Sequence, residues 1–244
     1  MWSRTIDGQV LRFRLLGVNN QNFLMVDEQT GSWWQQVTGE AVQGPLAGKR
    51  LTQIASDQVR LVRWRQEHPT TAVLAVDPRL ADRYLPDDWE SRVAEVPAPP
   101  AAQSAARIAG GLKPRELIVG VEVEGQAKAY AMAVLEAQSP IADMVGGVPI
   151  LIVLDDDGRS VRCFERRIEG RTLELFRQAD AASFALVDAE TGSAWDFAGH
   201  ATAGPLEGQT LAQRQTLLSY WFDWHNHHPA TAVFAARGLP APAG

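Results

Sequence analysis

Alternating apolar and polar residues in both halves of the chain predict β-strands. Residues 9–15 (QVLRFRL) and 172–176 (TLELF) alternate in this way, which is typical of a strand with one buried face. A second apolar stretch follows each, NFLMVD at 22–27 and SFALVD at 183–188, and both end in an Asp-x-x-Thr-Gly-Ser turn. The pattern therefore predicts strands joined by tight turns.

A helical period follows in each half, over about residues 56–68 and 213–228. Apolar residues recur at i, i+3 and i+7 in both segments and predict a stripe that packs on a sheet. We expect Ser56, with the aspartate after it, to cap the first helix. Pro69 and Pro229 should end the two helices, because a proline disfavours helical geometry in the preceding residue.

Four further segments complete the predicted organisation. Short apolar runs at 71–76 (TAVLAV) and 231–236 (TAVFAA) predict buried strands after the helices. Residues 117–132 (LIVGVEVEGQAKAYAM) carry the pattern and the central glycine of a hairpin. Residues 81–112 are rich in Ala and Pro and predict a linker with a helical start.

The two halves also share one sequence pattern. An alignment that begins at Gly8 and Gly170 runs to Thr71 and Thr231 with only two single-residue gaps. It matches the Thr-Gly-Ser turn, a strand tryptophan, a Gly-Pro-Leu-x-Gly turn, a helix tryptophan and a His-Pro pair. We interpret this as an internal duplication and predict a mainly β (α+β) fold with two related β-rich lobes, each with one packed helix.

These phrases resemble a bacterial and archaeal family known as domain of unknown function 3179. The phrases VGVEVEGQAKAYAM, ADMVGGVPILIV, CFERRIEGRTLEL, VDAETGSAW and GPLEGQTL stand in the family's order across residues 118–237. Residues 2–77 resemble only the second half of the family domain. The resemblance therefore implies a half-copy unit at 1–80, the linker at 81–112, a near-complete repeat domain at 113–237 and a tail at 238–244.

The family's reactive groups have no counterparts in this chain. The resemblance places Asp-Asp-Asp-Gly (residues 155–158) where relatives carry Cys-Pro-Leu-Cys, and Ala-Gln-Ser (residues 137–139) where they carry Trp-His-Glu. Two thiols at that spacing can bind a metal or form a disulfide. The stretch LDDDGRS also lacks the spacing of an EF-hand calcium loop and predicts an acidic β-turn.

The resemblance places Met1 in the middle of a family domain, at the position of Cys163 in the second copy. We therefore expect either a missing N-terminal half, which would also carry any signal peptide, or one complete copy plus a half-copy. The chain by itself predicts a cytoplasmic protein, whereas an upstream signal peptide would predict a periplasmic or extracellular one.

Composition narrows the classes of partner. The net charge of −6 and the pI near 5.4 do not suit a surface that binds nucleic acid phosphates. The single cysteine, Cys163, excludes an intrachain disulfide and a cysteine-based zinc site. No run reaches the roughly 18–20 apolar residues of a membrane span, so we expect no transmembrane segment. As partner we expect another protein.

Histidines provide the densest group of candidate metal ligands. His225 and His228 are spaced i, i+3 on the second predicted helix, and His200 is a conceivable third ligand. In the first copy only His68 matches, at the position of His228. We therefore favour structural or solvated histidines, expect no cofactor, and keep a divalent metal as the alternative.

Positions at which the copies differ are candidate interaction residues. Trp33 matches Ala194 and should point to the strand face opposite Trp34, whereas Glu40 matches His200. His227 stands where the first copy has a glutamate. We predict an interaction surface that includes Trp33, Glu40 and His227. Tryptophans that recur in both copies are instead predicted to pack in the core, and these are Trp34, Trp195, Trp64 and Trp224.

These observations favour a non-catalytic binding or structural module that has lost the thiol and histidine groups of its relatives. Such a module would serve as an accessory subunit of a larger or envelope-associated assembly. The alternative is a metal-dependent or redox enzyme that uses the remaining histidines. We predict no catalytic residues, because no histidine, serine or second carboxylate accompanies Glu40 in both copies.

Overall fold

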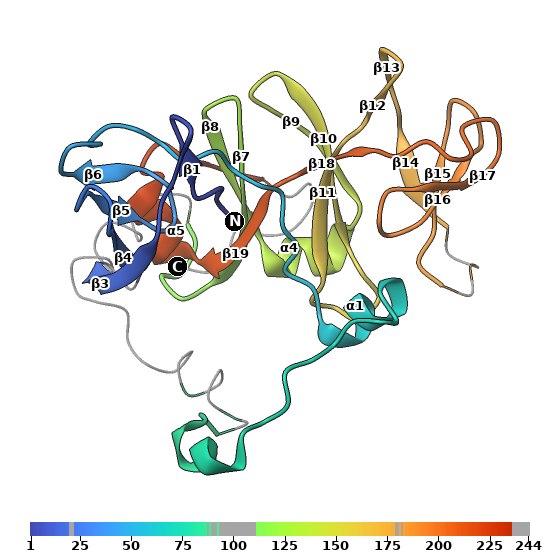
Figure 1. Cartoon of the computed structure of the whole chain (residues 1–244). Helices are drawn as coiled ribbons and strands as arrows, with labels where there is room; N and C mark the ends of the chain where they lie inside the picture. The colour runs from blue at the N-terminus through green and yellow to red at the C-terminus, as the bar shows by residue number, and fades with distance from the viewer. Residues whose placement is uncertain are drawn as a thin grey trace.

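The computed structural model describes residues 1–19, 22–86, 88, 92, 111–178, 181 and 183–235, and these residues are mainly β, as predicted (Figure 1). Most of the predicted linker and the whole predicted tail therefore lie outside the described residues. The linker's first residues belong to a 3-10 helix, η1 (Pro78–Arg83), so the predicted helical start is present.

The first lobe is an antiparallel sheet that follows the chain order. Its strands are β3 (Phe13–Asn19), β4 (Asn22–Asp27), β5 (Trp33–Gln35) and β6 (Ala41–Gln43), preceded by a ribbon of β1 (Thr5–Ile6) and β2 (Gln9–Val10).

The second lobe has the same order of strands. They are β14 (Leu175–Arg177), β15 (Leu186–Asp188), β16 (Ala194–Trp195) and β17 (Ala201–Ala203), preceded by a ribbon of β12 (Arg167–Ile168) and β13 (Arg171–Thr172).

Two central sheets lie between the lobes (Figure 1). One has the order β18 (Ala212–Arg214), β11 (Val161–Glu165), β10 (Val148–Leu154) and β9 (Ile141–Val145). The other has the order β19 (Thr216–Tyr220), β7 (Leu117–Val123), β8 (Gln126–Ala131) and β20 (Ala232–Val233), and β20 pairs parallel to β8. The β7–β8 hairpin is the one that the sequence predicts.

Each lobe is organised around the same buried turn. Asp27 accepts hydrogen bonds from the Trp34 indole (2.8 Å) and from the Thr30 backbone (2.5 Å). Asp188 accepts the matching bonds from the Trp195 indole (2.9 Å) and the Thr191 backbone (2.6 Å). Trp34 and Trp195 are 2% and 0% exposed, which confirms their predicted core positions. The shared turn chemistry explains why this phrase occurs twice, while the duplication remains an interpretation of the sequence.

Within the described residues, three α-helices lie beside the central sheets, namely α1 (Leu61–Glu67), α4 (Met132–Gln138) and α5 (Trp221–His227). The predicted ends at Pro69 and Pro229 are confirmed, but both helices begin later than predicted. Residues 212–214 and 216–220 instead form β18 and β19, because β11 and β7 offer them free edges. Ser56 therefore does not cap α1, whose N-cap residue Arg60 makes no side-chain capping bond.

The two helix segments differ in burial. In α5, Trp221 and Trp224 are 0% and 3% exposed, as the predicted stripe requires. In α1 no residue is buried, so the predicted packing stripe and the predicted core position of Trp64 are both wrong, because Trp64 is only partly covered. The predicted strand at 71–76 is also wrong: these residues form no strand and Leu74 is 96% exposed. The segment after α5 finds a free edge at β8 and forms β20 there, whereas β9 occupies the matching edge of β10.

Helices α1 and α5 each cross to the lobe of the other half. The segment with α1 follows the first lobe in sequence, yet the Arg63 guanidinium lies 5.2 Å from the ring of Phe197 in the second lobe. The segment with α5 follows the second lobe, yet Asp223 accepts a hydrogen bond from Asn22 of the first lobe. The two halves are therefore interlocked through the central sheets (Figure 1).

Candidate functional site

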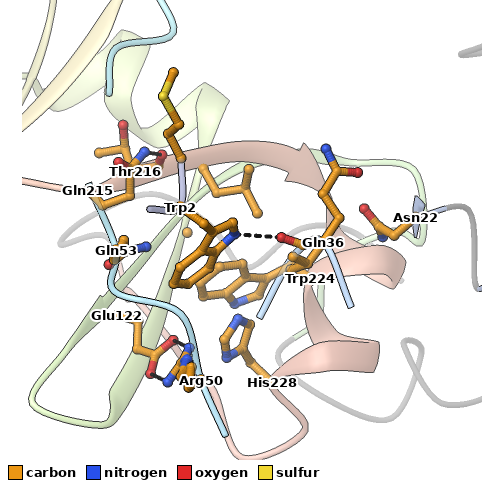
Figure 2. Close-up of a pocket in the computed structure, with 14 residues that line it drawn as sticks. Trp2, Asn22, Gln36, Arg50, Gln53, Glu122, Gln215, Thr216, Trp224 and His228 are labelled. Atoms are coloured by element: carbon orange, nitrogen blue, oxygen red, sulfur yellow. Dashed lines mark hydrogen bonds and ion pairs between the residues drawn. The ribbon is translucent and has the colours of Figure 1, made fainter. Parts of the chain in front are cut away.

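The first lobe meets β7, β19 and α5 at a pocket of about 220 Å³, which we call the first junction (Figure 2). Its walls come from the first lobe and from β7, β19 and α5, which are far apart in the sequence. The lining residues are Met1, Trp2, Asn22, Gln36, Val37, Arg50, Gln53, Gly120, Glu122, Gln215, Thr216, Leu217, Trp224 and His228.

Trp2 forms one wall of the pocket and is held in a fixed orientation. Its indole Nε1 donates a hydrogen bond to the backbone oxygen of Gln36 (2.7 Å). Gly39 lies directly against the ring, because a Cβ at that position would approach the indole to 2.6 Å. The Arg50 guanidinium lies 5.6 Å from the ring centroid, a distance that suits a cation–π contact.

Trp224 forms a second wall, from α5. Its indole Nε1 donates to Thr231 Oγ1 (2.9 Å), and the His228 ring lies 4.0 Å from its own ring, centroid to centroid. On strand β7 the residue beneath it is Gly120, where a Cβ would come within 2.4 Å of the Trp224 ring. A glycine is therefore required at position 120 for this tryptophan to reach its place.

The ionisable groups of the pocket are balanced. Arg50 pairs with Glu122 across 3.3 and 3.4 Å and donates from Nε to the Thr38 backbone oxygen (2.6 Å). Burial lowers the pKa of His228; Glu122 opposes this shift, while nearby positive charges reinforce it, so its imidazole is mainly uncharged at neutral pH. Met1 also lines the pocket, and its amino group donates to Ser56 Oγ (3.2 Å), a residue that does not line it.

The second lobe meets β11 and α1 at a matching place, which we call the second junction. The Phe164 ring lies against Gly199, as Trp2 lies against Gly39, since a Cβ there would approach it to 2.7 Å. The Trp64 indole donates to Thr71 Oγ1 (2.9 Å), as Trp224 does to Thr231. The two junctions therefore share their aromatic framework.

The second junction is closed by charged side chains. Gln58 forms a backbone bridge to Val161 on β11, and its counterpart Leu218 pairs with Val119 on β7. Arg162, the residue after Val161, therefore stands at the same register position as Gly120, the residue after Val119. Arg162 is 5% exposed, and it forms ion pairs with Asp57 (2.6 Å) and Glu67 (2.7 Å). Its guanidinium lies 4.7 Å from the Phe197 ring centroid.

A second ion pair lies at one of the two positions where the resemblance places thiols. Asp155, at the position that the resemblance gives to the first thiol, is 1% exposed and pairs with Arg63 of α1. Asp157 accepts hydrogen bonds from the backbone of Ser160 (2.7 Å) and from its hydroxyl (2.6 Å), and Gly158 has a φ of 67°. The predicted acidic β-turn is thus confirmed.

The three histidines that the sequence singles out as possible metal ligands do not converge. His200 lies in the second lobe, 57% exposed and 3.3 Å from Asp196. His225 packs on Trp221 with ring centroids 5.1 Å apart, and His228 lines the pocket at the first junction. Across the described part of the chain, no three His, Cys, Asp or Glu side chains are grouped to hold a metal ion.

The predicted interaction residues lie in three different settings. Trp33 is half-buried on β5, and Glu40 is exposed, in a backbone bridge to Arg50. His227 is 9% exposed, and its Nε2 lies 3.3 Å from the Asn22 amide nitrogen and 3.8 Å from Asp223. It therefore contacts the first lobe of its own chain.

Sequence reasoning did not single out the pocket residues Trp2, Arg50, Gln53 and Glu122. One signal was available, because the copies differ at two of these positions: Trp2 corresponds to Phe164 and Arg50 to Thr210. The contribution of Glu122 depends on how the halves cross, which the sequence pattern does not contain.

The fold and the site define a mainly β protein of two interlocked halves, with one open and one closed junction. The chain belongs to the family described as "Protein of unknown function (DUF3179)", whose model matches residues 1–231 in one stretch. No curated protein and no solved structure matches it. Among the described residues, no helix has the length and apolar character to cross a membrane. The division into a half-copy and a near-complete copy stays a prediction.

Proposed function

We propose that this chain is a non-catalytic binding module whose ligand site is the pocket at the first junction. The observation that carries the proposal is the contrast between the two junctions. They share an aromatic framework, but Arg162 and its two acidic partners fill one of them. Gly120 leaves the other open, and concave sites with a few convergent polar groups are the usual places for small ligands.

The chemistry of the reactive groups favours binding over catalysis. Burial raises the pKa of the Cys163 thiol to about 12, so it is protonated and unreactive at neutral pH. Asp155 is neutralised by Arg63, and the one carboxylate in the pocket, Glu122, is paired with Arg50. None of these groups is placed beside a base or nucleophile that would activate it.

A protein partner is part of the same proposal. Exposed apolar side chains are frequent from the start of α1 to the residues after η1, and such patches mark interaction surfaces. Those at least half exposed are Leu61, Val62, Val73, Leu74, Val76 and Leu85. We propose that this segment faces a larger assembly in which the chain is an accessory subunit, near the cell envelope if its precursor carries a signal peptide.

A ligand screen by thermal unfolding tests the binding site. Compounds that bind the pocket should raise the unfolding midpoint of the native protein and should raise it much less in a Gln53→Ala variant, which removes an amide from the lining. Gln209→Ala, an exposed change in the second lobe, serves as the control and should respond like the native protein. Hits that act equally on Gln53→Ala would show that the pocket is not the site.

Elemental analysis of the purified chain tests the non-catalytic assignment. We expect less than stoichiometric metal, with no change in the unfolding midpoint after treatment with a chelator. A bound metal at one equivalent would contradict the proposal and would favour the alternative, a metal-dependent or redox enzyme that uses its histidines.

A further inference from the structure

The charges around the pocket at the first junction indicate which class of ligand it takes. Arg50 and Glu122 neutralise each other across the pocket wall, and the His228 imidazole is mainly uncharged. The amino group of Met1 is hydrogen-bonded to Ser56, which does not line the pocket. A ligand with a negative charge would have to displace Glu122 from Arg50, and one with a positive charge would have to displace Arg50 from Glu122. An uncharged ligand leaves this pair intact.

The groups that remain for a ligand are amides and aromatic surfaces. Gln53 and Gln36 line the pocket, and neither side chain is hydrogen-bonded within the described residues. Each amide offers two donors and an acceptor, which suits hydroxyl groups because a hydroxyl both donates and accepts. Trp2 and Trp224 add apolar walls.

The size of the pocket limits the ligand to one small ring or chain. Its volume of about 220 Å³ lies below the roughly 300–1,000 Å³ of pockets that take drug-sized ligands. We propose that the pocket binds a small uncharged ligand rich in hydroxyl groups, such as a monosaccharide or another polyol. This inference rests on the proposed function and adds the ligand class.

Three probes on one pyranose ring test the inference, namely glucose, glucosamine and glucuronate. They differ mainly in charge, so they separate the role of the balanced pair from that of shape. Binding is followed by NMR through the indole N–H signals of Trp2 and Trp224, each assigned with a Trp→Phe variant. We expect glucose to shift both signals and to bind at least tenfold more tightly than either charged probe.

Two single variants should then reverse the preference. Glu122→Gln leaves Arg50 without its partner, so affinity for glucuronate should rise at least tenfold relative to glucose. Arg50→Gln leaves Glu122 unpaired, so glucosamine should gain in the same way. Gln53→Ala should weaken glucose about tenfold, while Gln209→Ala, an exposed change in the second lobe, should have no effect. Unfolding curves of every variant show whether it is folded.

The possible results distinguish this inference from the proposed function. Equal or tighter binding of a charged probe to the native protein would overturn the ligand class. Absence of binding by all three probes, together with screening hits that Gln53→Ala weakens, would overturn the ligand class and leave the binding module in place. Absence of any ligand that depends on the pocket would overturn both.

Discussion

At the scale of single residues, one buried carboxylate in each lobe holds the Asp-x-x-Thr-Gly-Ser turn together. Burial alone would raise the pKa of Asp27, but hydrogen bonds from Trp34, Thr30 and Ser32 outweigh it and lower the pKa below 3.8. The pKa of Asp188 is lowered in the same way by its own indole and turn. The Asp-x-x-Thr-Gly-Ser phrase was therefore sufficient to predict this turn, because every partner lies within seven residues.

Replacing Asp27 or Asp188 by Asn should lower the free energy of unfolding by about 1.5–3 kcal/mol each at pH 7, the usual contribution of hydrogen bonds to a charged group. Because the folded pKa lies below the unfolded one, the stabilisation is present above pH 3.8 and is lost as the pH falls through the folded pKa. Urea unfolding at pH 7 and pH 3 measures this. Variants with the native acid dependence would contradict the assignment.

His228 should also make stability fall as the pH drops, but in this case protonation creates a charge instead of removing one. Its folded pKa lies below the unfolded 6.5, so protonation favours the unfolded chain and stability falls as the pH drops from about 6.5 through the folded pKa. Replacing His228 by Gln should reduce the loss of stability between pH 7.5 and pH 5 in urea unfolding. Gln209→Ala, an exposed change that involves no titratable group, should leave that loss unchanged.

At the scale of elements, local pattern predicted the strands of both lobes and the β7–β8 hairpin, but tertiary pairing decided the rest. Residues 212–220 have a helical pattern, yet they form strands because β11 and β7 need partners at those edges. Residues 71–76 have the pattern of a strand and find no edge. Sequence alone does not tell which edges are free, so two nearly identical segments were predicted to behave alike and do not.

The pair Leu74 and Phe234 tests this difference between matching segments. Phe234 stacks on Tyr130 with ring centroids 5.3 Å apart, whereas Leu74 is 96% exposed. Phe234→Ser should therefore cost about 2–4 kcal/mol of stability, as for the loss of a packed aromatic. Leu74→Ser should stay within about 0.5 kcal/mol of the native value in the same urea titration. Similar losses in both variants would show that residues 71–76 are packed after all.

At the scale of the whole molecule, α1 and α5 cross between the halves. Ion pairs from Arg63 and Glu67 hold α1 against the central sheet. The pocket at the first junction results from this arrangement, since Trp2, Arg50, Glu122 and Trp224 come from four separate stretches of the chain. No motif or spacing links these positions. The sequence therefore predicted the framework residues around the site but not the site itself.

Arg162 is the central charged side chain of the second junction, and its replacement should lower the free energy of unfolding strongly. Replacing it by Leu leaves Asp57 and Glu67, which are 16% and 18% exposed, without their partner. The expected cost is about 3 kcal/mol or more, because an uncompensated buried charge is left behind. Arg171→Leu, at an exposed position in β13, provides the control. A change of less than about 1 kcal/mol in urea unfolding would mean that α1 is held by other contacts.

The crossing of α1 and α5 has a practical consequence for how this chain can be divided. A cut between residues 88 and 112 would yield two pieces, each holding a helix that docks on the other. Neither piece should fold alone, yet both together should reassemble without a peptide bond between them. The protein would then behave as a pair of complementing fragments, and a reporter fused to each would signal only when the halves meet.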